Sequence, residues 1–535
     1  MRTICITILI ILFQLHGFSQ KEYHVFPITH KITPGKPEGT GSISRPWDLQ
    51  TALNQTLKVK GGDVIWLHDG VYNGLYVSAL SSKINDKYIT VSAFKNAKVI
   101  LNGNVASPRK HVLQVKGKRV HFKDFEITCL GGFSRDEKES DFKRINGIDH
   151  ASGIDCRFEN IKIFNVPGLG FGSWKNTGGS IIEDCMIYNN GYISKNGKGR
   201  GEGMYVQNNS DKNRFIKNNI IFNNYYKGIE VWSANKNATT EYIKNVVLEN
   251  NIIFNNGAPA GTFKDNLIVA TGDRNGKNIA KNITVSNNIF YHNTNFTANQ
   301  VNGDGASLTI GFNAKAPVEN VKVHNNIIIG RNNALRILHA KTLSYRNNTS
   351  YAGYVHFFNS VVPNINPENW DFDNNTYYTK NSRVFRISKF RDFTIKDWKS
   401  TYKIDLNSRI SNIKDFDLDP ILNILEYGES KYRVALFDKQ GKNVLVDFSK
   451  YNFLKGTAFK IYDAENREVV LTKGSLDEDL KVEFPMGMQA FEKPLHNSKA
   501  RKTLNSFGVY FIEFEGVNMS ERKTFFGKLI KKLFG

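Results

Sequence analysis

Two short stretches of the chain bring together side chains that can transfer protons and carry charge. A basic, glycine-rich loop contains Glu202 and leads directly into Tyr205, and a later stretch contains Lys227 and Glu230. Carboxylates, a phenol and a cation are the groups that acid–base chemistry on an anionic substrate requires. The candidate catalytic residues are therefore Tyr205, Glu230, Lys227 and Glu202.

Aromatic, cationic and amide side chains accompany these four positions and suit the binding of an anionic sugar polymer. Aromatic rings offer flat apolar faces, and Arg and Lys pair with carboxylate or sulfate groups. The candidate substrate-binding residues are Arg200, Gln207, Trp232, Lys175, Trp174, Arg336, His339 and Arg274.

Elimination and hydrolysis place different demands on such a set. β-Elimination on a uronate requires a base for the proton next to the carboxylate, a cation for the developing negative charge, and an acid for the leaving oxygen. The tyrosine, lysine and arginine side chains of the set can fill these roles. Hydrolysis requires two carboxylates at a fixed separation. Glu202 and Glu230 form an alternative pair of that kind, but the strand sequences contain no pair of aspartates.

No cofactor and no metal site are expected. Acidic residues are sparse around the candidate site, which favours charge neutralisation by Arg or Lys over Ca²⁺. The acidic loop 136–141 is the alternative Ca²⁺ site, and we interpret it as a solvated charged loop. Cys129, Cys156 and Cys185 are odd in number and lack CxxC spacing, so buried thiols are expected instead of disulfides or metal ligands.

A repeated phrase indicates the elements that position these residues. Pairs of asparagines, most of them followed by apolar residues, recur along the middle of the chain, at 218–219, 250–251, 287–288, 325–326, 347–348 and 374–375. Asn tolerates the left-handed backbone of a turn, and its amide can bond to the coils above and below. A solenoid of coils with loops of variable length explains this recurrence.

A second series of strands interleaves with the asparagine pairs and carries the candidate site. Alternation along these strands places one uniformly apolar set on the core face, namely Met204, Val206, Ile229, Val231, Leu267, Val269, Leu308, Ile310, Leu335 and Ile337. The opposite face carries Tyr205, Gln207, Glu230, Trp232, Thr309 and Arg336. Stacked coils would align these outward residues in columns on one sheet.

The segment 61–74, with the sequence GGDVIWLHDGVYNG, resembles the first coil of the pectin-lyase-like superfamily. The segment 44–53 resembles the short capped helix that closes the open end in such proteins, and the resemblance covers residues 24–410. It implies a right-handed parallel β-helix. Because this superfamily includes lyases, hydrolases, epimerases and binding proteins, the resemblance indicates the fold more strongly than the reaction.

The predicted fold class is all-β, a right-handed parallel β-helix solenoid with a small C-terminal β-sandwich-like domain. The expected divisions are a signal peptide over 1–20, the β-helix over 21–410, a connector over 411–430, a small β-sandwich over 431–519 and a basic amphipathic tail over 520–535. An apolar run behind Arg2 predicts export, and no later segment is predicted to span a membrane.

The formal net charge of +22 predicts a polyanionic partner. For an exported protein this partner is a sulfated or uronate-containing polysaccharide, expected to be algal. Nucleic acid is not expected because no nucleic-acid-binding motif occurs, and the protein is expected to be a monomer.

The sequence therefore predicts a carbon–oxygen lyase that acts by β-elimination, either cleaving the chain or dehydrating an oligosaccharide end. A glycoside hydrolase of the same fold, and a non-catalytic glycan-binding surface protein, are the alternatives.

Overall fold

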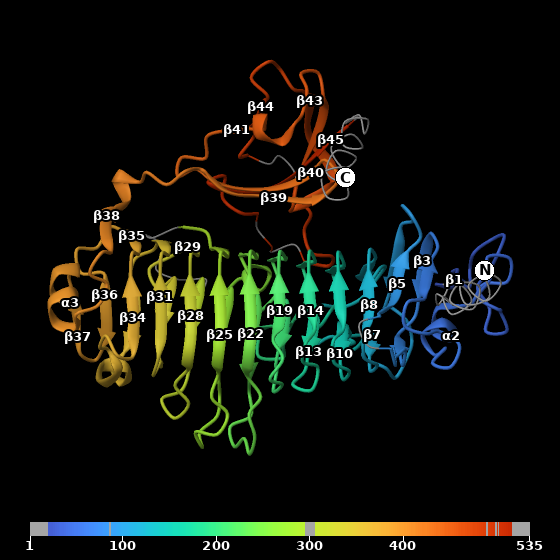
Figure 1. The fold of residues 1–535 in the computed structure, drawn as a ribbon, viewed down its shortest axis with the longest axis horizontal. Helices are drawn as coiled ribbons and strands as arrows, with labels where there is room; N and C mark the ends of the chain where they lie inside the picture. Colours follow the sequence, from blue (N-terminus) through green and yellow to red (C-terminus); the bar gives the residue numbers. More distant parts are fainter. Residues whose placement is uncertain are drawn as a thin grey trace, which may run out of the picture.

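The computed structural model describes residues 20–84, 87–294, 305–487, 491–497, 500 and 502–515. The predicted signal peptide, apart from its last residue, and the predicted basic tail lie outside these ranges. Regular structure in the described residues is almost entirely β, and three parallel sheets of 12 strands each run along the long axis of the molecule (Figure 1).

Each coil contributes one strand to each sheet. Sheet 1 contains, in order, β1 (Glu22–Val25), β2 (Val64–Leu67), β5 (Ile89–Ala93), β8 (Val120–Lys123), β11 (Arg157–Glu159), β14 (Ile181–Glu183), β19 (Arg214–Lys217), β22 (Lys244–Glu249), β25 (Lys281–Ser286), β28 (Glu319–His324), β31 (Leu343–Arg346) and β34 (Trp370–Asp373). Sheet 2 contains β4 (Tyr76–Ser78), β7 (His111–Val115), β10 (Asn146–His150), β13 (Phe171–Ser173), β18 (Met204–Val206), β21 (Ile229–Ser233), β24 (Leu267–Thr271), β27 (Leu308–Ile310), β30 (Leu335–Ile337), β33 (Val355–Phe358), β36 (Phe385–Ser388) and the antiparallel β37 (Arg391–Phe393). Sheet 3 contains β3 (Gly70–Asn73), β6 (Val99–Asn102), β9 (Glu126–Thr128), β12 (Lys162–Phe164), β15 (Met186–Tyr188), β20 (Ile220–Phe222), β23 (Ile252–Phe254), β26 (Ile289–Tyr291), β29 (Ile327–Ile329), β32 (Thr349–Tyr351), β35 (Thr376–Thr379) and β38 (Arg409–Asn412).

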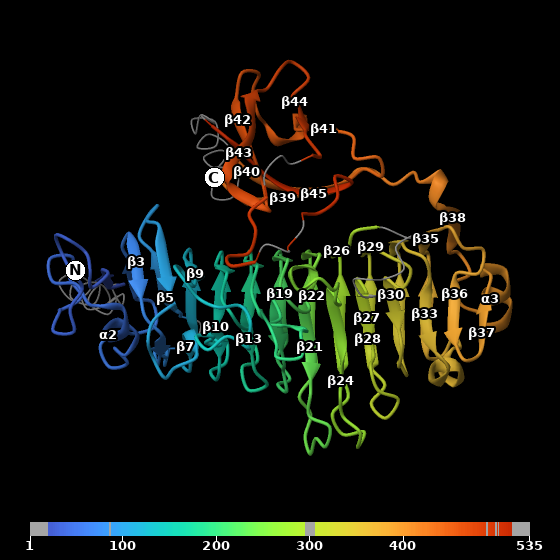
Figure 2. The ribbon, with the colours of Figure 1, turned by 180° about the vertical axis from the view of Figure 1, so that it is seen from behind.

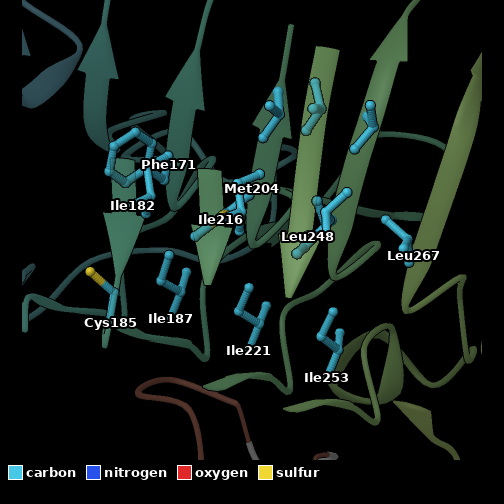
Figure 3. Packing of buried hydrophobic residues seen from close by; sticks show 14 of the residues in the cluster. Phe171, Ile182, Cys185, Ile187, Met204, Ile216, Ile221, Leu248, Ile253 and Leu267 are labelled. Atoms are coloured by element: carbon cyan, nitrogen blue, oxygen red, sulfur yellow. The ribbon is translucent and has the colours of Figure 1, made fainter. Parts of the chain in front are cut away.

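Aliphatic side chains fill the space between the three sheets. Met204 and Leu267 of sheet 2, Ile216 and Leu248 of sheet 1, and Ile253 of sheet 3 point into one continuous core (Figure 3). All ten residues predicted for the core face of sheet 2 are fully buried. Burial of this kind stabilises by about 25 cal/mol per Å² of apolar surface, so the alternation of the strands fixes which side chains face outward.

The two asparagines of each pair have different structural roles. The first Asn of each pair has a left-handed backbone, with φ of 55–58° at Asn218, Asn250, Asn287, Asn325, Asn347 and Asn374. The second Asn is buried and donates a hydrogen bond of 2.9–3.2 Å from its amide to the amide oxygen of the next coil, from Asn219 through Asn251, Asn288, Asn326 and Asn348 to Asn375. A second ladder, which the sequence analysis did not predict, joins Asn190, Asn224, Asn256 and Asn266.

Short helices close the ends of the solenoid. Helix α2 (Leu49–Leu53), capped by Asp48, covers the first coils, as the resemblance implied, and α3 (Ile395–Tyr402), capped by Thr394, covers the last coils. Buried Leu49, Leu53 and Trp398 seal the core at the two ends. No helix within the described residues is both long and apolar enough to cross a membrane.

An antiparallel β unit follows the solenoid. Its strands are β39 (Ile421–Gly428), β40 (Lys431–Phe437), β42 (Ala458–Asp463), β43 (Asn466–Ser475) and β45 (Phe507–Phe514) in one sheet, and β41 (Val444–Asp447) with β44 (Lys481–Phe484) in another. Strand β39 lies inside the segment 411–430 that we expected to be a connector. The parallel β-helix and the small C-terminal β domain are otherwise as predicted.

The C-terminal unit packs on the outer face of sheet 3, as both ribbon views show (Figures 1 and 2). Phe507 stacks on Tyr291 with ring centroids 4.1 Å apart, and Arg433 donates hydrogen bonds to the backbone carbonyl groups of Asn218 and Asn250. This contact leaves the outer face of sheet 2 uncovered by the C-terminal unit.

Candidate functional site

Parallel pairing aligns the predicted outward residues in one column on sheet 2. Gly172 pairs with Tyr205, Tyr205 with Glu230, and the column continues through Ile268, Thr309 and Arg336. Neighbouring strands lie about 4.8 Å apart. Tyr205 and Glu230, which are separated by a whole coil in sequence, are therefore adjacent.

Lys227 lies at the centre of the cluster. Its ammonium group is 2.5 Å from Glu230 Oε1 and 4.0 Å from Asp265 Oδ2, and the three side chains are only 5–14% exposed. Burial would lower the pKa of Lys227, but the Glu230 and Asp265 carboxylates outweigh burial and raise that pKa above its ordinary value. Lys227 therefore remains a cation across the working pH range.

Asp265 connects this cation to the far end of the column. Its Oδ1 accepts a hydrogen bond of 2.8 Å from Thr309 Oγ1 and lies 3.3 Å from Arg336 Nη2. Arg336 is thus held in place by a carboxylate that is shared with Lys227.

Glu202 supplies a second acidic group beside this cluster. Gly203 N donates to the carbonyl oxygen of Lys227, so the chain segments that carry Glu202 and Lys227 run side by side. Gly201, with φ of +94°, allows the turn that leads into Glu202, a conformation that L residues rarely adopt. Burial and the Glu230 carboxylate raise the pKa of Glu202 to about 7, so this group can change protonation near neutral pH.

Tyr205 is oriented by the next coil. The backbone N–H of Ala234 donates to Tyr205 Oη at 3.2 Å, which leaves the hydroxyl hydrogen available for donation elsewhere. Burial, followed by the Glu230 charge, raises the pKa of Tyr205, so the phenol remains protonated and can act as an acid.

Trp174 lies on the sheet next to Tyr205. Its Nε1 donates to Asp149 Oδ1 at 2.6 Å, and its ring centroid is 5.4 Å from that of Tyr205. A Cβ atom on Gly172 would approach the indole to 3.1 Å, so glycine at this position lets the ring lie against the strand. The result is a fixed aromatic surface on the outer face.

The remaining predicted residues divide into those near the cluster and those outside it. Trp232 lies 5.6 Å from the Lys227 ammonium, Gln207 Nε2 donates to the Trp232 carbonyl, and exposed Arg200 lies 5.7 Å from the Tyr226 ring. Lys175 Nζ lies 4.0 Å from the Tyr242 ring. These contacts place Trp232, Gln207 and Arg200 at the edge of the site, whereas the contact of Lys175 with Tyr242 does not join it to the cluster.

His339 and Arg274 are not brought into the cluster. His339 is buried and its Nδ1 is 2.7 Å from Ser360 Oγ, while burial lowers its pKa. Arg274 is exposed on the loop after β24, where its backbone N–H bonds to Lys236. Both residues come after the last residue of a strand, where alternation no longer determines which way a side chain points.

Sequence reasoning did not assign roles to Asp265 and Asp149. Both lie in or beside strands of sheet 2, and both hold a residue of the predicted set, Arg336 and Trp174 respectively. The signal for Asp265 was its register with Lys227: each stands two positions before a strand of sheet 2, and the Gly228 N–H donates to the Asp265 carbonyl oxygen.

Within the described part of the chain, no group of three or more His, Cys, Asp or Glu side chains is arranged so that it could hold a metal ion. In the loop 136–141, Asp136 accepts from the Lys138 N–H and Glu137 accepts from the Lys195 N–H. Cys129, Cys156 and Cys185 are free and buried, as predicted.

The fold and this face define a parallel β-helix protein with a charged outer column. No protein-family model matches the chain, and no curated protein matches it in sequence. Among solved structures, pectate lyase Pel9A is similar over 70% of this chain and 78% of its own, with 16% identity and a TM-score of 0.40. XylC in complex with xylose is similar over 86% and 95%, with 12% identity and a TM-score of 0.44. A rhamnogalacturonan lyase is similar over 75% and 89%, with 16% identity and a TM-score of 0.43.

Proposed function

We propose that the protein is a carbon–oxygen lyase that acts by β-elimination on an anionic polysaccharide. The observation that carries this proposal is the buried Lys227 cation, which lies beside Glu230 and within the same cluster as Tyr205 and Glu202. A cation, a phenol that keeps its proton and a carboxyl group that titrates near neutral pH are the three groups that elimination requires.

The reaction follows from these roles. The Glu202 carboxylate removes the proton next to the substrate carboxylate, and Lys227, supported by Arg200, stabilises the negative charge that develops. The Tyr205 hydroxyl donates its proton to the leaving glycosidic oxygen as the carbon–oxygen bond breaks. Glu230 and Asp265 act as positioning residues because they hold the Lys227 ammonium.

The substrate class follows from charge. A net charge of +22 and the cationic side chains around the column favour a uronate-containing polysaccharide, sulfated or not, of the kind found in algae. The protein would meet this substrate as an exported monomer. Chain cleavage and dehydration of an oligosaccharide end use the same elimination step, and both belong to this proposal.

Ultraviolet absorbance tests the proposal, because elimination leaves a conjugated double bond at the new end. The purified protein would be incubated with a panel of uronate-containing polysaccharides. We expect absorbance to rise with at least one of them, and Glu202→Gln and Tyr205→Phe to slow this rise by about 100-fold or more. The control is Glu368→Gln, at an exposed position outside the Lys227 cluster, and it should not change the rate. New reducing ends without absorbance would contradict the proposal.

A glycoside hydrolase is the second candidate, supported by the interaction between Glu202 and Glu230. The Glu230 charge contributes to the raised pKa of Glu202, which resembles the unequal carboxyl pair of a glycosidase. In that reaction Glu202 would donate a proton instead of removing one. The protonation state required of Glu202 therefore separates the two candidates.

A further inference from the structure

A hollow opens on the outer face of sheet 2, several coils toward the N-terminus from the Lys227 cluster. It is a cavity of about 530 Å³ beside α2, β4 and β7. Its lining comprises Gln50, Asn54, Tyr76, Val77, Pro108, Arg109, Lys110, His111, Gln114 and Lys116. This lining contains three permanent cations and no carboxylate. The Asp149 carboxylate contacts His111 and Gln114 from the neighbouring strand, so the cations outnumber the nearby carboxylate and favour an anion.

The wall of this cavity is built by hydrogen bonds. Arg109 Nη1 donates to Gln50 Oε1 at 3.1 Å and to the Leu75 carbonyl oxygen at 2.6 Å. Gln50 in turn donates to the Val77 carbonyl oxygen and accepts from the Val77 N–H. The guanidinium is therefore fixed against the end of helix α2 and strand β4.

The lysines of the cavity remain available to a ligand. Lys110 and Lys116 are exposed, and neither forms an ion pair with the residues that the structure describes. The partly buried ring of Tyr76 adds an aromatic surface beside them. A cationic rim around an aromatic floor suits a sugar ring that bears an anionic group.

The cavity and the Lys227 cluster lie on one continuous strip. Val77, Gln114, Asp149, Gly172 and Tyr205 occupy successive positions of the same column of sheet 2. From β7 to β18 there are three strand steps, or about 14 Å.

Direct contacts bridge this distance. Gln114 Nε2 donates to Asp149 Oδ2 at 2.7 Å, Trp174 Nε1 donates to Asp149 Oδ1, and the Trp174 ring lies next to Tyr205. A single oligosaccharide laid along this strip would touch the cavity and the cluster together.

We infer that this cavity is a distal binding subsite for an anionic sugar of the same glycan chain whose reacting bond lies at Lys227. The anionic group is a sulfate ester or a uronate carboxylate, which present the same charge to Arg109, Lys110 and Lys116. The ligand class rests on the proposed function, while the subsite itself rests on the cavity and its charges.

Binding measurements with matched charge changes test this inference. The probes are dextran sulfate, polygalacturonate and neutral dextran, and the protein carries Glu202→Gln so that turnover during the measurement is small. Lys110→Gln with Lys116→Gln should weaken binding of at least one anionic probe by tenfold or more. Lys442→Gln with Lys473→Gln removes the same charge from exposed positions of the C-terminal unit and should change binding less than twofold.

The pattern of loss identifies the anionic group. Loss confined to dextran sulfate assigns a sulfate subsite, and loss confined to polygalacturonate assigns a carboxylate subsite. The inference would be overturned if the two double-lysine variants bound the anionic probes equally well. It would also be overturned if the protein with Glu202→Gln alone bound neither anionic probe. If the wild-type protein forms no unsaturated product but the cavity variants still lose binding, elimination is wrong and the subsite stands.

Discussion

Lys227 lies between the carboxylates of Glu230 and Asp265, which hold its ammonium group in place. The side chains of Lys227, Glu230 and Asp265 are largely removed from water. A buried charge that loses its partner is strongly unfavourable, because neither water nor another side chain then compensates it.

Replacing Lys227 should therefore affect both stability and activity. We expect Lys227→Met to lower the free energy of unfolding by about 3 to 5 kcal/mol, and to abolish elimination. The double variant Lys227→Met with Glu230→Gln should recover part of the stability without recovering activity. Chemical denaturation together with the ultraviolet assay measures both. Full recovery of activity in the double variant would contradict the role of Lys227 as the stabilising cation.

The pH dependence reports the role of Glu202. Its raised pKa of about 7 means that the carboxylate form, which acts as the base, is lost as pH falls through about 7. The elimination rate should therefore fall on the acidic side of about 7 and level off above it. A rate that instead falls as pH rises through about 7 would assign Glu202 as an acid and favour hydrolysis.

Among the structural elements, the strands were predictable and the loops were not. Alternation in sheet 2 predicted both its core face and the column of Tyr205 and Glu230, because a one-residue shift would bury charge. Beyond the strand ends, alternation no longer predicts where a side chain points, which is why His339 and Arg274 lie outside the Lys227 cluster. Apolar residues on the outer face of sheet 3 were a sign of the docked C-terminal unit that the sequence analysis did not use. Ile220 and Phe222 are buried there because the C-terminal unit covers them.

The buried asparagine ladder should contribute more stability than the exposed one. Asn288 donates to the Leu248 carbonyl and to Asn326 inside the turn, whereas Asn320 bonds to Asn282 at the surface. We expect Asn288→Asp to cost about 3 kcal/mol or more, because it buries a carboxylate and removes the three hydrogen bonds that the Asn288 amide donates. Asn320→Asp, of equal size and charge, should cost less than about 1 kcal/mol. Equal losses in thermal or chemical unfolding would argue against a structural ladder.

In the molecule as a whole, one face of the solenoid packs against the C-terminal unit and another face carries the proposed reaction. The C-terminal unit covers the apolar outer face of sheet 3, while the charged column occupies sheet 2. The C-terminal unit therefore does not cover the charged column, and it has no contact role in the proposed reaction.

A change in the covered face should thus lower stability and leave catalysis intact. Phe507 packs on Tyr291 and Phe254, so Phe507→Ala should cost about 3 kcal/mol or more. The control Leu445→Ala, at a position 57% exposed, should cost less than about 0.5 kcal/mol. Below the unfolding transition both variants should retain the wild-type elimination rate. A large loss of rate in folded Phe507→Ala would connect the C-terminal unit to the site.

The fate of water at the cleaved bond tests the central claim most directly. Polysaccharide that the protein degrades would be treated in heavy-oxygen water, and the products examined by mass spectrometry. Elimination on the outer face of sheet 2 predicts that each cleavage gives one product with an unsaturated end, that no label enters at the cleaved bond, and that the masses of the two products sum to that of the substrate. Saturated products, one of which gains a labelled oxygen for each bond cleaved, would show hydrolysis and contradict the account.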